Sequence, residues 1–466
     1  MRLAGILLAG LACGLNLVGL FDHDLWMPDE PREAEIAREY SVRESWTTPW
    51  LNSGRWLEKP PLYHWAAAAL FRATGTASPG VARLPSALSG IGIGLLAWLL
   101  ASRLGPKGIG PWAAFLAWTS AQLLSVSHGA MVDALFSLCV TGAVTALAFE
   151  EGVLAALCMG LSFLAKFHLG PMMAGATAVG WGFLSGNWKP VKALLKPLPV
   201  LVFLAVALPW PWRLYQAQGA FGAEALRETL WGQLFARSTG GSFGHAQPPW
   251  YYLPQVLIFA APASLLLPWA GVWAWKKRKE DRLASLCLAW LLGSLVLLSI
   301  PRAKRAVYLA PCVVPAAVLA ALWGREFLER RQEWKKWALG GAICLPVLLS
   351  TAGGVLIPRM DARLSFQPLA WQVKRLSTAG FPRTIEGYSL SENVQGAVCF
   401  ALGQRVRCFT EPAHLAERLK MGRRLVVMPA SAWRDLVFDR RVAGRMRLVG
   451  GAEADGERYS IVESVP

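Results

Sequence analysis

The sequence predicts a polytopic α-helical membrane protein that carries a small α/β domain at its C-terminal end. Its 466 residues are 54% hydrophobic with a mean hydropathy of +0.37, and long apolar windows recur as far as residue 357. Charged residues make up 17% of the chain, against about 25% in soluble globular proteins. The 23 Trp, 44 Gly and 30 Pro residues also suit a membrane protein, where Trp gathers at interfaces and Gly and Pro are tolerated within spans. This composition excludes a disordered chain, a coiled coil and a collagen-like chain.

Eleven apolar windows are candidate transmembrane helices. A helix needs about 20 apolar residues to cross the hydrocarbon core, and each window is bounded by charged or turn-forming residues. The windows lie at residues 3–21, 80–100, 111–126, 132–149, 153–167, 171–184, 197–212, 252–275, 283–300, 306–323 and 337–357. The first is longer than the apolar core of a signal peptide, so we expect it to be retained as a span.

The net charge of +17 would suggest a nucleic-acid partner in a soluble protein, but here the basic residues follow the loops. If the N-terminus is cytoplasmic, sixteen Lys and Arg residues fall in short loops on that side. This bias is the usual signature of cytoplasmic loops. We therefore expect membrane lipids and no nucleic acid as partners, and an odd number of spans places the C-terminus outside the cytoplasm.

Residues 1–358 are predicted to form the transmembrane domain and residues 359–466 a separate extracytoplasmic α/β domain. Beyond residue 358, short β-rich runs alternate with helix-like stretches, a pattern typical of a compact α/β module. The expected strands lie at 384–390, 405–409, 425–428 and 458–462, and the expected helices at 392–402, 412–420 and 431–438.

The cysteines indicate no metal cluster. Six of the eight lie in predicted spans, where they are most simply small hydrophobic side chains. Cys399 and Cys408 fall in the outer domain, where an oxidising compartment allows a disulfide, and the sequence leaves their pairing open. The chain has no CxxC pair.

The first loop outside the cytoplasm, residues 22–79, is long and dense in acidic and basic residues. Loops of this length are usually functional or disordered, and the aromatic content of this one argues against disorder. Residues 33–42 and 60–71 have helical character but are too short to span the bilayer, so we expect two helices in the membrane interface.

Some charged residues of this loop have a structural explanation. Asp29 and Glu30 precede Pro31 and could cap a helix. Glu35, Arg38 and Glu39 are expected on a solvated helix face.

Ionisable residues from distant parts of the chain fall on the same predicted side of the membrane as this loop. Asp133 begins the fourth span, Lys166 ends the fifth, and Lys304 and Tyr308 lie at the start of the tenth. Ionisable residues at a membrane boundary are costly and mark functional sites by default. Asp133 could instead interact only with its helix dipole, and the two lysines could be snorkelling anchors.

Two motifs in the first loop carry a family resemblance. Residues 29–39 read DEPREAEIARE and residues 57–65 read LEKPPLYHW. Their order and spacing resemble the aminoarabinose transferase (ArnT-like) family of integral-membrane glycosyltransferases, which have the GT-C fold and are related to protein O-mannosyltransferases. Agreement continues through residues 82–88 and 248–252 and ends near residue 325.

The resemblance implies an enzyme of the bacterial inner membrane with its active site facing the periplasm. Members of the family pass a sugar from a polyprenyl (undecaprenyl) phosphate carrier to an extracytoplasmic acceptor. The acceptor would be lipid A, as in lipopolysaccharide modification, another envelope glycan, or protein. No nucleotide is needed, which agrees with the absence of a phosphate-binding loop.

The resemblance also implies roles for individual residues. Asp29 would be the base, Asp133 a second carboxylate that orients the acceptor or a partner side chain, and Glu58 a wall of the same cavity. The candidate ligands of the carrier phosphate are Lys59, Arg237, Tyr308 and Lys304. Further candidates are Glu30, Arg32, Arg83, Lys166, His245 and Tyr251. Together these residues would line one water-accessible pocket at the outer face of the membrane.

One departure from the family concerns metal binding. The family commonly has Glu-Asn or Glu-His before an Arg in the loop ahead of residues 248–252, and here Gly232 and Gln233 occupy that place. The resemblance therefore implies no certain cofactor and leaves a divalent metal open.

Two other function classes compete with the glycosyltransferase. A transporter or flippase for a lipid-linked or anionic substrate would also collect charges within a helix bundle, but it would place them near mid-membrane and often in repeated halves. A non-catalytic scaffold or receptor would have no use for a loop dense in paired acids and bases.

Overall fold

The computed structural model describes residues 2–232, 246–378, 384–442 and 444–465. The backbone divides into two compact units. The first, here called the helical unit, comprises Met1–Leu20, Leu57–Tyr63 and Arg83–Ala352. The second, here called the mixed unit, comprises Phe21–Trp56, His64–Ala82 and Gly353–Pro466.

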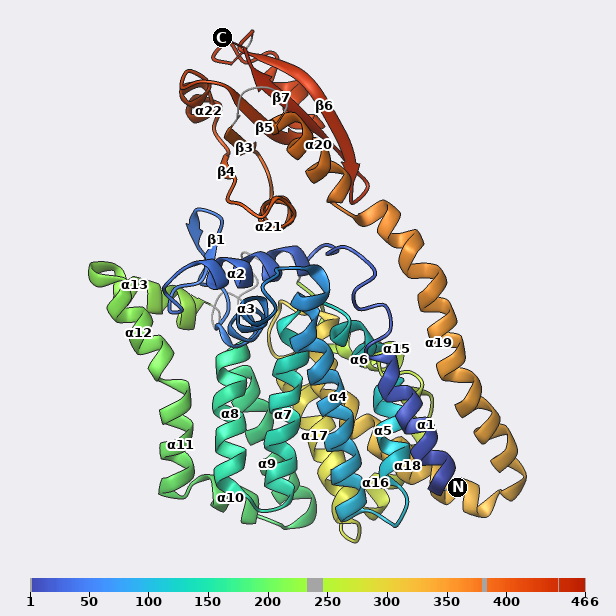
Figure 1. The fold of residues 1–466 in the computed structure, drawn as a ribbon. Helices are drawn as coiled ribbons and strands as arrows, with labels where there is room; N and C mark the ends of the chain where they lie inside the picture. The colour runs from blue at the N-terminus through green and yellow to red at the C-terminus, as the bar shows by residue number, and fades with distance from the viewer. Residues whose placement is uncertain (1, 233–245, 379–383, 443, 466) are drawn as a thin grey trace. The chain divides into compact units, whose positions relative to one another are not determined.

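The helical unit consists of helices joined mostly by short loops (Figure 1). Its α-helices, two of which continue into the mixed unit, are α1 (Arg2–Leu15), α4 (Pro79–Leu104), α5 (Gly110–Trp118), α6 (Ala121–Ser127), α7 (Val132–Ala148), α8 (Gly152–Lys166), α9 (Leu169–Ser185), α10 (Lys189–Leu194), α11 (Pro197–Ala207), α12 (Pro209–Ala217), α13 (Gly222–Leu226), α15 (Tyr252–Phe259), α16 (Leu267–Lys277), α17 (Arg282–Ser299), α18 (Val313–Arg330) and α19 (Lys335–Leu364). Tighter or wider turns form η1 (Gly219–Phe221), η2 (Arg227–Gly232), η3 (Pro249–Tyr251), η4 (Ala263–Leu265), η5 (Ala306–Cys312) and η6 (Gln332–Trp334).

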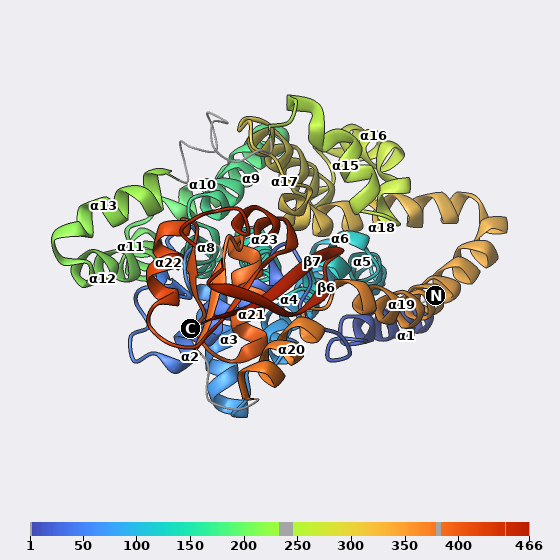
Figure 2. The same ribbon diagram turned by 90° about the horizontal axis from the view of Figure 1, so that it is seen from above.

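Helices α7, α8, α9 and α17 pack side by side in the centre of this unit (Figure 1). Small residues let them approach closely, as is usual where helices associate in lipid. A Cβ on Gly293 of α17 would lie 3.4 Å from the Ala176 backbone of α9. Helices α11 and α12 lie at the edge of the unit in Figure 2, where little of their apolar surface is buried.

Five helical segments among the described residues are long and apolar enough to cross a membrane. They are Pro79–Leu104, Pro197–Ala217, Arg282–Ser299, Ala306–Arg330 and Gln332–Leu364. The bent pair α6 and α7 would add a sixth. The apolar helices confirm the membrane character that the composition predicts, whereas the count of eleven spans stays a prediction.

Several of the predicted spans are not single uninterrupted α-helices. Helix α1 ends at Leu15, so the end of the window at 3–21 forms turns. The window at 111–126 is broken between α5 and α6, where the Ser120 hydroxyl accepts a hydrogen bond from the Leu123 N–H and caps α6. The window at 252–275 is interrupted by η4 after Pro262, which has no N–H to continue α15.

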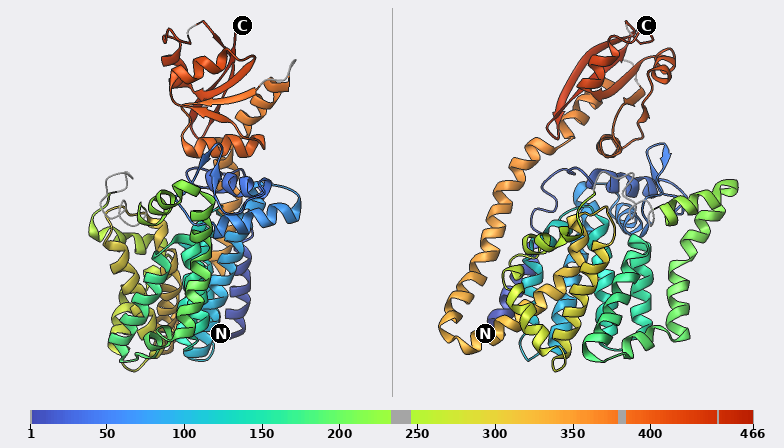
Figure 3. Two further views of the ribbon diagram at one scale, coloured as in Figure 1. Left: turned by 90° about the vertical axis from the view of Figure 1, so that its left-hand side faces the viewer. Right: turned by 180° about the vertical axis from the view of Figure 1, so that it is seen from behind.

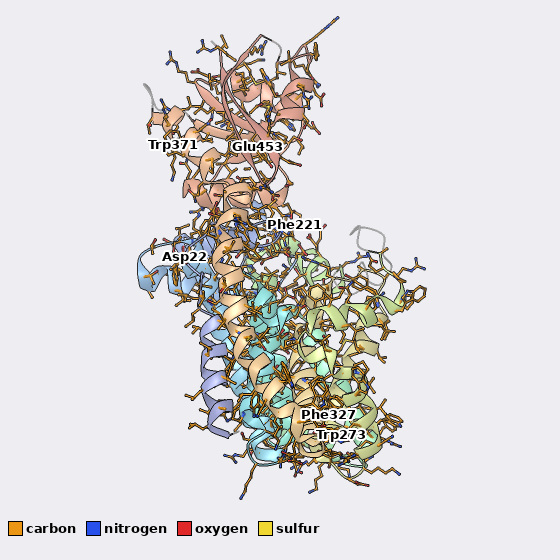
Figure 4. All side chains as sticks on the ribbon, turned by 90° about the vertical axis from the view of Figure 1, so that its right-hand side faces the viewer. Asp22, Phe221, Trp273, Phe327, Trp371 and Glu453 are labelled. Atoms are coloured by element: carbon orange, nitrogen blue, oxygen red, sulfur yellow. The ribbon has the colours of Figure 1, made fainter. Side chains whose placement is uncertain are left out.

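The basic loops of the helical unit gather at one end, where α1 also begins (Figure 1). Arg325 donates to the Lys107 carbonyl at 3.3 Å, and Arg282 donates to the Ala148 carbonyl at 2.8 Å. Trp273 donates to Glu326 at 2.6 Å, and Figure 4 shows the labelled Trp273 beside Phe327 at this end. The clustering agrees with loops that share one side of a membrane.

The mixed unit combines the first loop with the C-terminal residues. Its helices are α2 (Glu30–Val42), α3 (Leu62–Thr74), α20 (Gln367–Thr378), α21 (Glu392–Leu402), α22 (Pro412–Leu419) and α23 (Ala430–Leu436). Its strands are β1 (Trp50–Leu51), β2 (Gly54–Arg55), β3 (Thr384–Tyr388), β4 (Arg407–Phe409), β5 (Arg424–Pro429), β6 (Met446–Ala454) and β7 (Glu457–Ser464).

Five of these strands form one sheet in the order β4-β3-β5-β7-β6 (Figures 1 and 3). Strands β4, β3 and β5 are parallel, and β7 and β6 are antiparallel to their neighbours. Leu425 and Val427 of β5 face the core under α20 and α21, whereas Val426 and Met428 face the core under α22 and α23. The period of two places successive side chains on opposite faces, so helices cover both.

The predicted α/β pattern of the C-terminal residues is confirmed at four strands and three helices, and two elements were missed. Strand β6 lies at the sheet edge and carries Gly450 and Gly451, so it lacks a continuous β-branched run. Helix α20 covers the sheet with the buried side chains of Leu369 and Val373.

The compact units do not follow the predicted boundary between residues 358 and 359, because the first loop packs against the C-terminal residues. Helix α2 lies against α21. Asp24 accepts hydrogen bonds from the Ser365 hydroxyl at 2.8 Å and the Phe366 N–H at 3.0 Å. The two predicted helices of this loop are present as α2 and α3, and their place in a membrane interface stays a prediction.

Cys399 and Cys408, whose pairing the sequence left open, are both free thiols. Burial raises the pKa of Cys408 to about 12, opposed by a hydrogen bond from Asn52. The thiol therefore stays protonated at neutral pH.

Substitution of Gly396 by Ala should separate α2 from α21. A Cβ on Gly396 would lie 2.8 Å from the backbone of Arg32, and backbone cannot move aside as a flexible side chain can. We expect the variant to lose about 1–3 kcal/mol of stability, the usual cost of overpacking. The measurement is the thermal unfolding midpoint of the purified protein in detergent.

Gly340→Ala in α19 is the matched control, because nothing lies within 4 Å of its Cβ position. The variant should be as stable as the wild type or slightly more stable, because Ala suits a helix better than Gly. Equal midpoints for the two variants would contradict the close approach of α2 and α21.

Candidate functional site

The start of α2 holds Asp29 and Arg32 in a fixed pair. Asp29 is the N-cap residue, and Pro31 in the first turn favours helix initiation there. The Asp29 side chain makes no capping hydrogen bond, so the capping role suggested for it is wrong. Its Oδ1 instead accepts a hydrogen bond from Arg32 Nη2 at 2.9 Å, and only about a tenth of either side chain is exposed.

Arg32 is held on several sides. Its guanidinium also donates to Glu33 Oε1 at 3.2 Å and to Asn393 Oδ1 of α21 at 3.1 Å, and it lies 5.3 Å from the Trp56 ring centre. A guanidinium fixed in this way presents its donors in one geometry. Arg32 therefore orients the Asp29 carboxylate.

Glu33 forms a second buried pair with His64. The His64 Nε2 lies 2.8 Å from Glu33 Oε2, and neither side chain is exposed. The two residues are 31 positions apart on α2 and α3. Sequence reasoning gave neither of them a role, because no local spacing relates residues on separate helices.

Glu30 has a structural contact at the same helix start. Its Oε2 accepts a hydrogen bond from the Trp26 N–H at 2.9 Å, which ties the preceding loop to the first turn. Glu30 thus holds the loop before α2, and this contact is not the helix cap that the sequence suggested for the acidic pair.

The prediction of a solvated face for Glu35, Arg38 and Glu39 is wrong. Both glutamates are fully buried and Arg38 is 7% exposed, because α21 and the loop after it cover this face. Arg38 donates to both Glu35 oxygens at 2.7 Å, and Arg405 donates to Glu39 at 3.0 Å. Burial raises the pKa of Glu35 to about 7, although the Arg38 hydrogen bonds oppose the shift.

The helical unit contains a separate buried ion pair between Asp133 and Lys166. Asp133 lies in the first turn of α7 and Lys166 in the last turn of α8, so both charges also suit their helix dipoles. The Lys166 ammonium bonds to Asp133 Oδ1 and lies 4.1 Å from the Tyr308 ring centre. Lys166 is therefore not a snorkelling anchor.

Lys304 is also turned inward. It is 3% exposed, and its ammonium donates to the carbonyl oxygens of Gln247 and Pro301. The Tyr252 hydroxyl donates to the Arg305 carbonyl at 3.3 Å, next to Tyr251 in η3. These contacts join the residues around 247–252 to those around 301–308, two segments that the resemblance implicates.

Other predicted site residues occupy different surroundings. Lys59 is buried and Glu58 half-buried in the short segment before α3. Arg83 is fully buried in α4 and donates to the Leu20 carbonyl at 3.2 Å. Arg237 and His245 lie outside the described residues.

The described residues offer no ready metal site. No group of three or more His, Cys, Asp or Glu side chains in this part of the chain is arranged to hold an ion.

The structure thus brings the candidates together in two sets. Asp29, Glu30 and Arg32 meet in the mixed unit, joined by Glu33 and His64. Lys166 contacts both Asp133 and Tyr308 in the helical unit, where the α7 segment also packs against η5. That all these residues line a single pocket stays a prediction. In the first set, the Asp29 carboxylate can take up a proton. The second set presents the Lys166 ammonium and the Tyr308 phenol.

Searches for similar proteins give a consistent result. No model of a protein family matches the sequence. The chain is 32% identical over 344 residues to the undecaprenyl phosphate-alpha-4-amino-4-deoxy-L-arabinose arabinosyl transferase of Pseudomonas paraeruginosa. The matched region covers 71% of this chain and 61% of that protein. It is 30% identical over 348 residues to the corresponding transferase 2 of Pseudomonas fluorescens, covering 72% and 61%. The chain thus spans about three fifths of the relatives' length.

Solved structures share the fold. The chain is similar to ArnT from Cupriavidus metallidurans bound to undecaprenyl phosphate, with a TM-score of 0.77 and 19% identity, over 99% of this chain and 98% of that one. It is also similar to the oligosaccharyltransferase AglB from Archaeoglobus fulgidus, with a TM-score of 0.57 and 12% identity, over 95% and 71%. The polytopic fold expected from the resemblance is confirmed.

Removal of one partner of the Asp133–Lys166 pair should destabilise the protein strongly. Lys166→Met leaves the Asp133 carboxylate buried without its cation, which typically costs about 3–5 kcal/mol. We expect the double variant Asp133→Asn with Lys166→Met to recover most of this loss, since no isolated charge remains. Chemical or thermal unfolding in detergent measures the cycle.

Arg325→Ala is the control, because it breaks the exposed pair with Glu329. Such pairs contribute about 0–1 kcal/mol. A Lys166→Met variant as stable as this control would show that the buried pair does not form.

Proposed function

Because the chain is an ArnT-like protein with the GT-C fold, we propose that it is an integral-membrane glycosyltransferase. It moves a sugar from undecaprenyl phosphate, or a related polyprenyl phosphate, to an acceptor outside the cytoplasm. The observation that carries this proposal is the 32% identity over 344 residues to an undecaprenyl-phosphate arabinosyl transferase. The structural neighbour that binds undecaprenyl phosphate supports the same donor class.

The reaction exchanges one bond for another at the anomeric carbon of the sugar. An acceptor oxygen forms the new glycosidic bond while the bond to the carrier phosphate breaks. A hydroxyl acceptor loses its proton to a base, and the polyprenyl phosphate departs with the bonding electron pair. The enzyme must therefore supply a base and cations for the phosphate.

Asp29 is the base in this proposal. Its carboxylate is mostly buried at the start of α2, and Arg32 holds one of its oxygens. Arg32 is fixed in turn by Glu33 and Asn393, so the carboxylate keeps one orientation. Such preorganisation is what a base needs to meet a substrate hydroxyl.

Lys59, Lys304, Tyr308 and Arg237 are the proposed ligands of the carrier phosphate, with Arg83 and Tyr251 as further candidates. Lys59 and Lys304 are buried cations outside regular helices, where water screens their charge least. Lys166 has a different role, because Asp133 already neutralises it. It packs against Tyr308, so the Asp133–Lys166 pair positions that phenol. Glu58 would border the same phosphate-binding region.

The proposed topology has eleven crossings, a cytoplasmic N-terminus, and a periplasmic active site and C-terminal α/β domain. Its support lies in the helical unit, where the basic loops share one end. Helix α8 starts beside Glu150, which pairs with Arg282, and carries Lys166 at its other end. The Asp133–Lys166 pair is thus far from the basic loops. A bacterial inner membrane orients such loops toward the cytoplasm.

The acceptor class can be found by mass spectrometry of envelope material from cells with and without the gene. Lipid A, other glycans and proteins would each show a different mass change. Loss of one glycosylated species in the deletion strain, restored by the wild-type gene, is the expected result. An unchanged envelope together with altered transport of a lipid-linked sugar would favour a flippase.

Asp29→Asn should abolish transfer without preventing folding. The amide keeps the size of the side chain and can still accept a hydrogen bond from Arg32, but it cannot take up the proton. We expect transfer to fall by about 10²–10⁴-fold, the usual contribution of a general base. The assay follows sugar release from the purified polyprenyl carrier.

Asp22→Asn is the matched control, since Asp22 is exposed in the same loop. It should transfer at the wild-type rate. Comparable rates for the wild type and Asp29→Asn would remove Asp29 from the mechanism.

Lys59→Ala should weaken binding of polyprenyl phosphate. Loss of a charge-assisted hydrogen bond costs about 1.5–3 kcal/mol, which corresponds to about a tenfold or larger rise in Kd. Lys59→Arg should retain much of the affinity because the charge remains. The exposed Lys107→Ala serves as a neutral comparison, and equal Kd values for all four proteins would exclude a phosphate role for Lys59.

A further inference from the structure

We propose that Glu33 and His64 are positioning residues that act on the Asp29 carboxylate through Arg32. This inference rests on the proposed function, in which Asp29 takes the proton of the acceptor hydroxyl. All four residues belong to the mixed unit, and hydrogen bonds connect them in the order His64, Glu33, Arg32, Asp29. The buried pair at one end of this series thus holds the guanidinium that holds the carboxylate.

One nitrogen of Arg32 serves two carboxylates. Its Nη2 lies 2.9 Å from Asp29 Oδ1 and 3.2 Å from Glu33 Oε1. A guanidinium Nη group carries two N–H bonds in a fixed plane, so one bond can point to each carboxylate. Asn393 accepts from the other terminal nitrogen, Nη1, at 3.1 Å. The direction in which Nη2 meets Asp29 therefore depends on where Glu33 lies.

His64 fixes the second oxygen of Glu33. Its Nε2 lies 2.8 Å from Glu33 Oε2, and because a carboxylate oxygen only accepts, the imidazole nitrogen donates. Neither side chain is exposed, so water cannot take the place of either partner. Held at one oxygen by Arg32 and at the other by His64, the Glu33 carboxylate keeps a single orientation.

The imidazole of His64 is not explained by packing, because its surroundings are apolar. Its ring centre lies 6.3 Å from that of Tyr40 and 5.9 Å from that of Trp56. These two rings belong to a buried cluster that also contains Ile36. Apolar side chains of similar volume often replace a buried polar pair without loss of stability. A phenylalanine would fill this space, but it could not donate to Glu33.

Trp56 limits the motion of both ends of the arrangement. The Arg32 guanidinium lies 5.3 Å from the centre of the Trp56 ring, and the His64 ring meets the same indole edge-on. Stacking and hydrogen bonding together leave the guanidinium little freedom. Such preorganisation lowers the barrier of a proton transfer that needs one geometry.

The test measures turnover by the full-length protein in detergent. The donor is the sugar-loaded polyprenyl carrier purified from cells that carry the gene, and the acceptor is envelope extract from the deletion strain. Glu33→Gln keeps the size of the side chain but removes the charge that holds Arg32. We expect kcat to fall by up to about 10²-fold, the cost of a small misplacement, with the KM for the carrier unchanged.

Two variants of similar size separate the donor of His64 from its volume. His64→Gln can still donate to Glu33 from its amide nitrogen, whereas His64→Phe cannot. We expect His64→Gln to retain most of the wild-type kcat and His64→Phe to lose as much as Glu33→Gln does.

The pH dependence of kcat provides a readout that a merely structural pair would not move. Glu33 places a negative charge beside Asp29, with Arg32 between them, and a like charge disfavours the ionised form of a carboxyl group. Its removal in Glu33→Gln should shift the acid limb of the profile to lower pH. An acid limb at the wild-type position would contradict the coupling.

A double variant guards against a simple loss of folding. Glu33→Leu with His64→Phe leaves neither member of the pair without its partner, so most of any lost stability should return. The kcat should stay low, because no carboxylate then holds the second bond of Arg32 Nη2.

Glu386→Gln is the matched control from the same unit. Glu386 is also fully buried, where it accepts from Arg418 and Arg424 at 2.9 Å. This variant should lose stability but keep the wild-type kcat at temperatures where it is folded.

A positioning role is overturned if Glu33→Gln and His64→Phe turn over as fast as the wild type, or if the double variant regains kcat together with stability. A loss of kcat in Glu386→Gln as large as that in Glu33→Gln would assign the effect to folding and also overturn it. Wild-type transfer with unimpaired variants removes this inference and leaves the proposed function standing. Absence of transfer by the wild type removes both.

Discussion

Charged side chains that leave water must find partners, and this requirement organises the mixed unit. Helix α2 carries Glu33, Glu35 and Glu39, none of which is exposed. An uncompensated buried charge would cost several kcal/mol, so each glutamate is paired, in one case with Arg405 from beyond α21. The pairing makes the first loop and the C-terminal residues one folded body. It also fixes Arg32, and through Arg32 the carboxylate proposed as the base.

Much of the fold could be predicted because its signals are local. The helices of the first loop and the alternation of strands and helices after residue 384 follow from the spacing of apolar residues along a few turns or strands. The acidic motif at residues 29–39 also identified Asp29 and Arg32, which are in direct contact. The charge bias of the loops anticipated that Arg282 and Arg325 lie at the same end of the helical unit.

What could not be predicted depends on contacts between distant segments. Glu35 and Glu39 look solvent-facing on an isolated helix, and only α21 makes them buried. The Glu33–His64 pair joins two helices with no shared periodicity. The break at Ser120 has a different cause. Composition marks the window as apolar, but it does not show that the Ser120 hydroxyl caps a new helix within it. For a similar reason the sequence left Lys166 open between a site residue and a snorkelling anchor, since its partner Asp133 is 33 residues away.

The link from Arg32 to Asn393 also has a consequence for biosynthesis. These residues are separated by 361 positions, and ribosomes add about 5–20 residues per second. Roughly 20–70 s must therefore pass between the emergence of the acidic helix and that of the segment that covers it. During this interval, the acids and arginines of α2 lack the partners that Asn393 and Arg405 supply. Chaperones that meet the growing polypeptide would encounter this helix before its cover exists, and a ribosome stalled ahead of residue 393 would leave it uncovered.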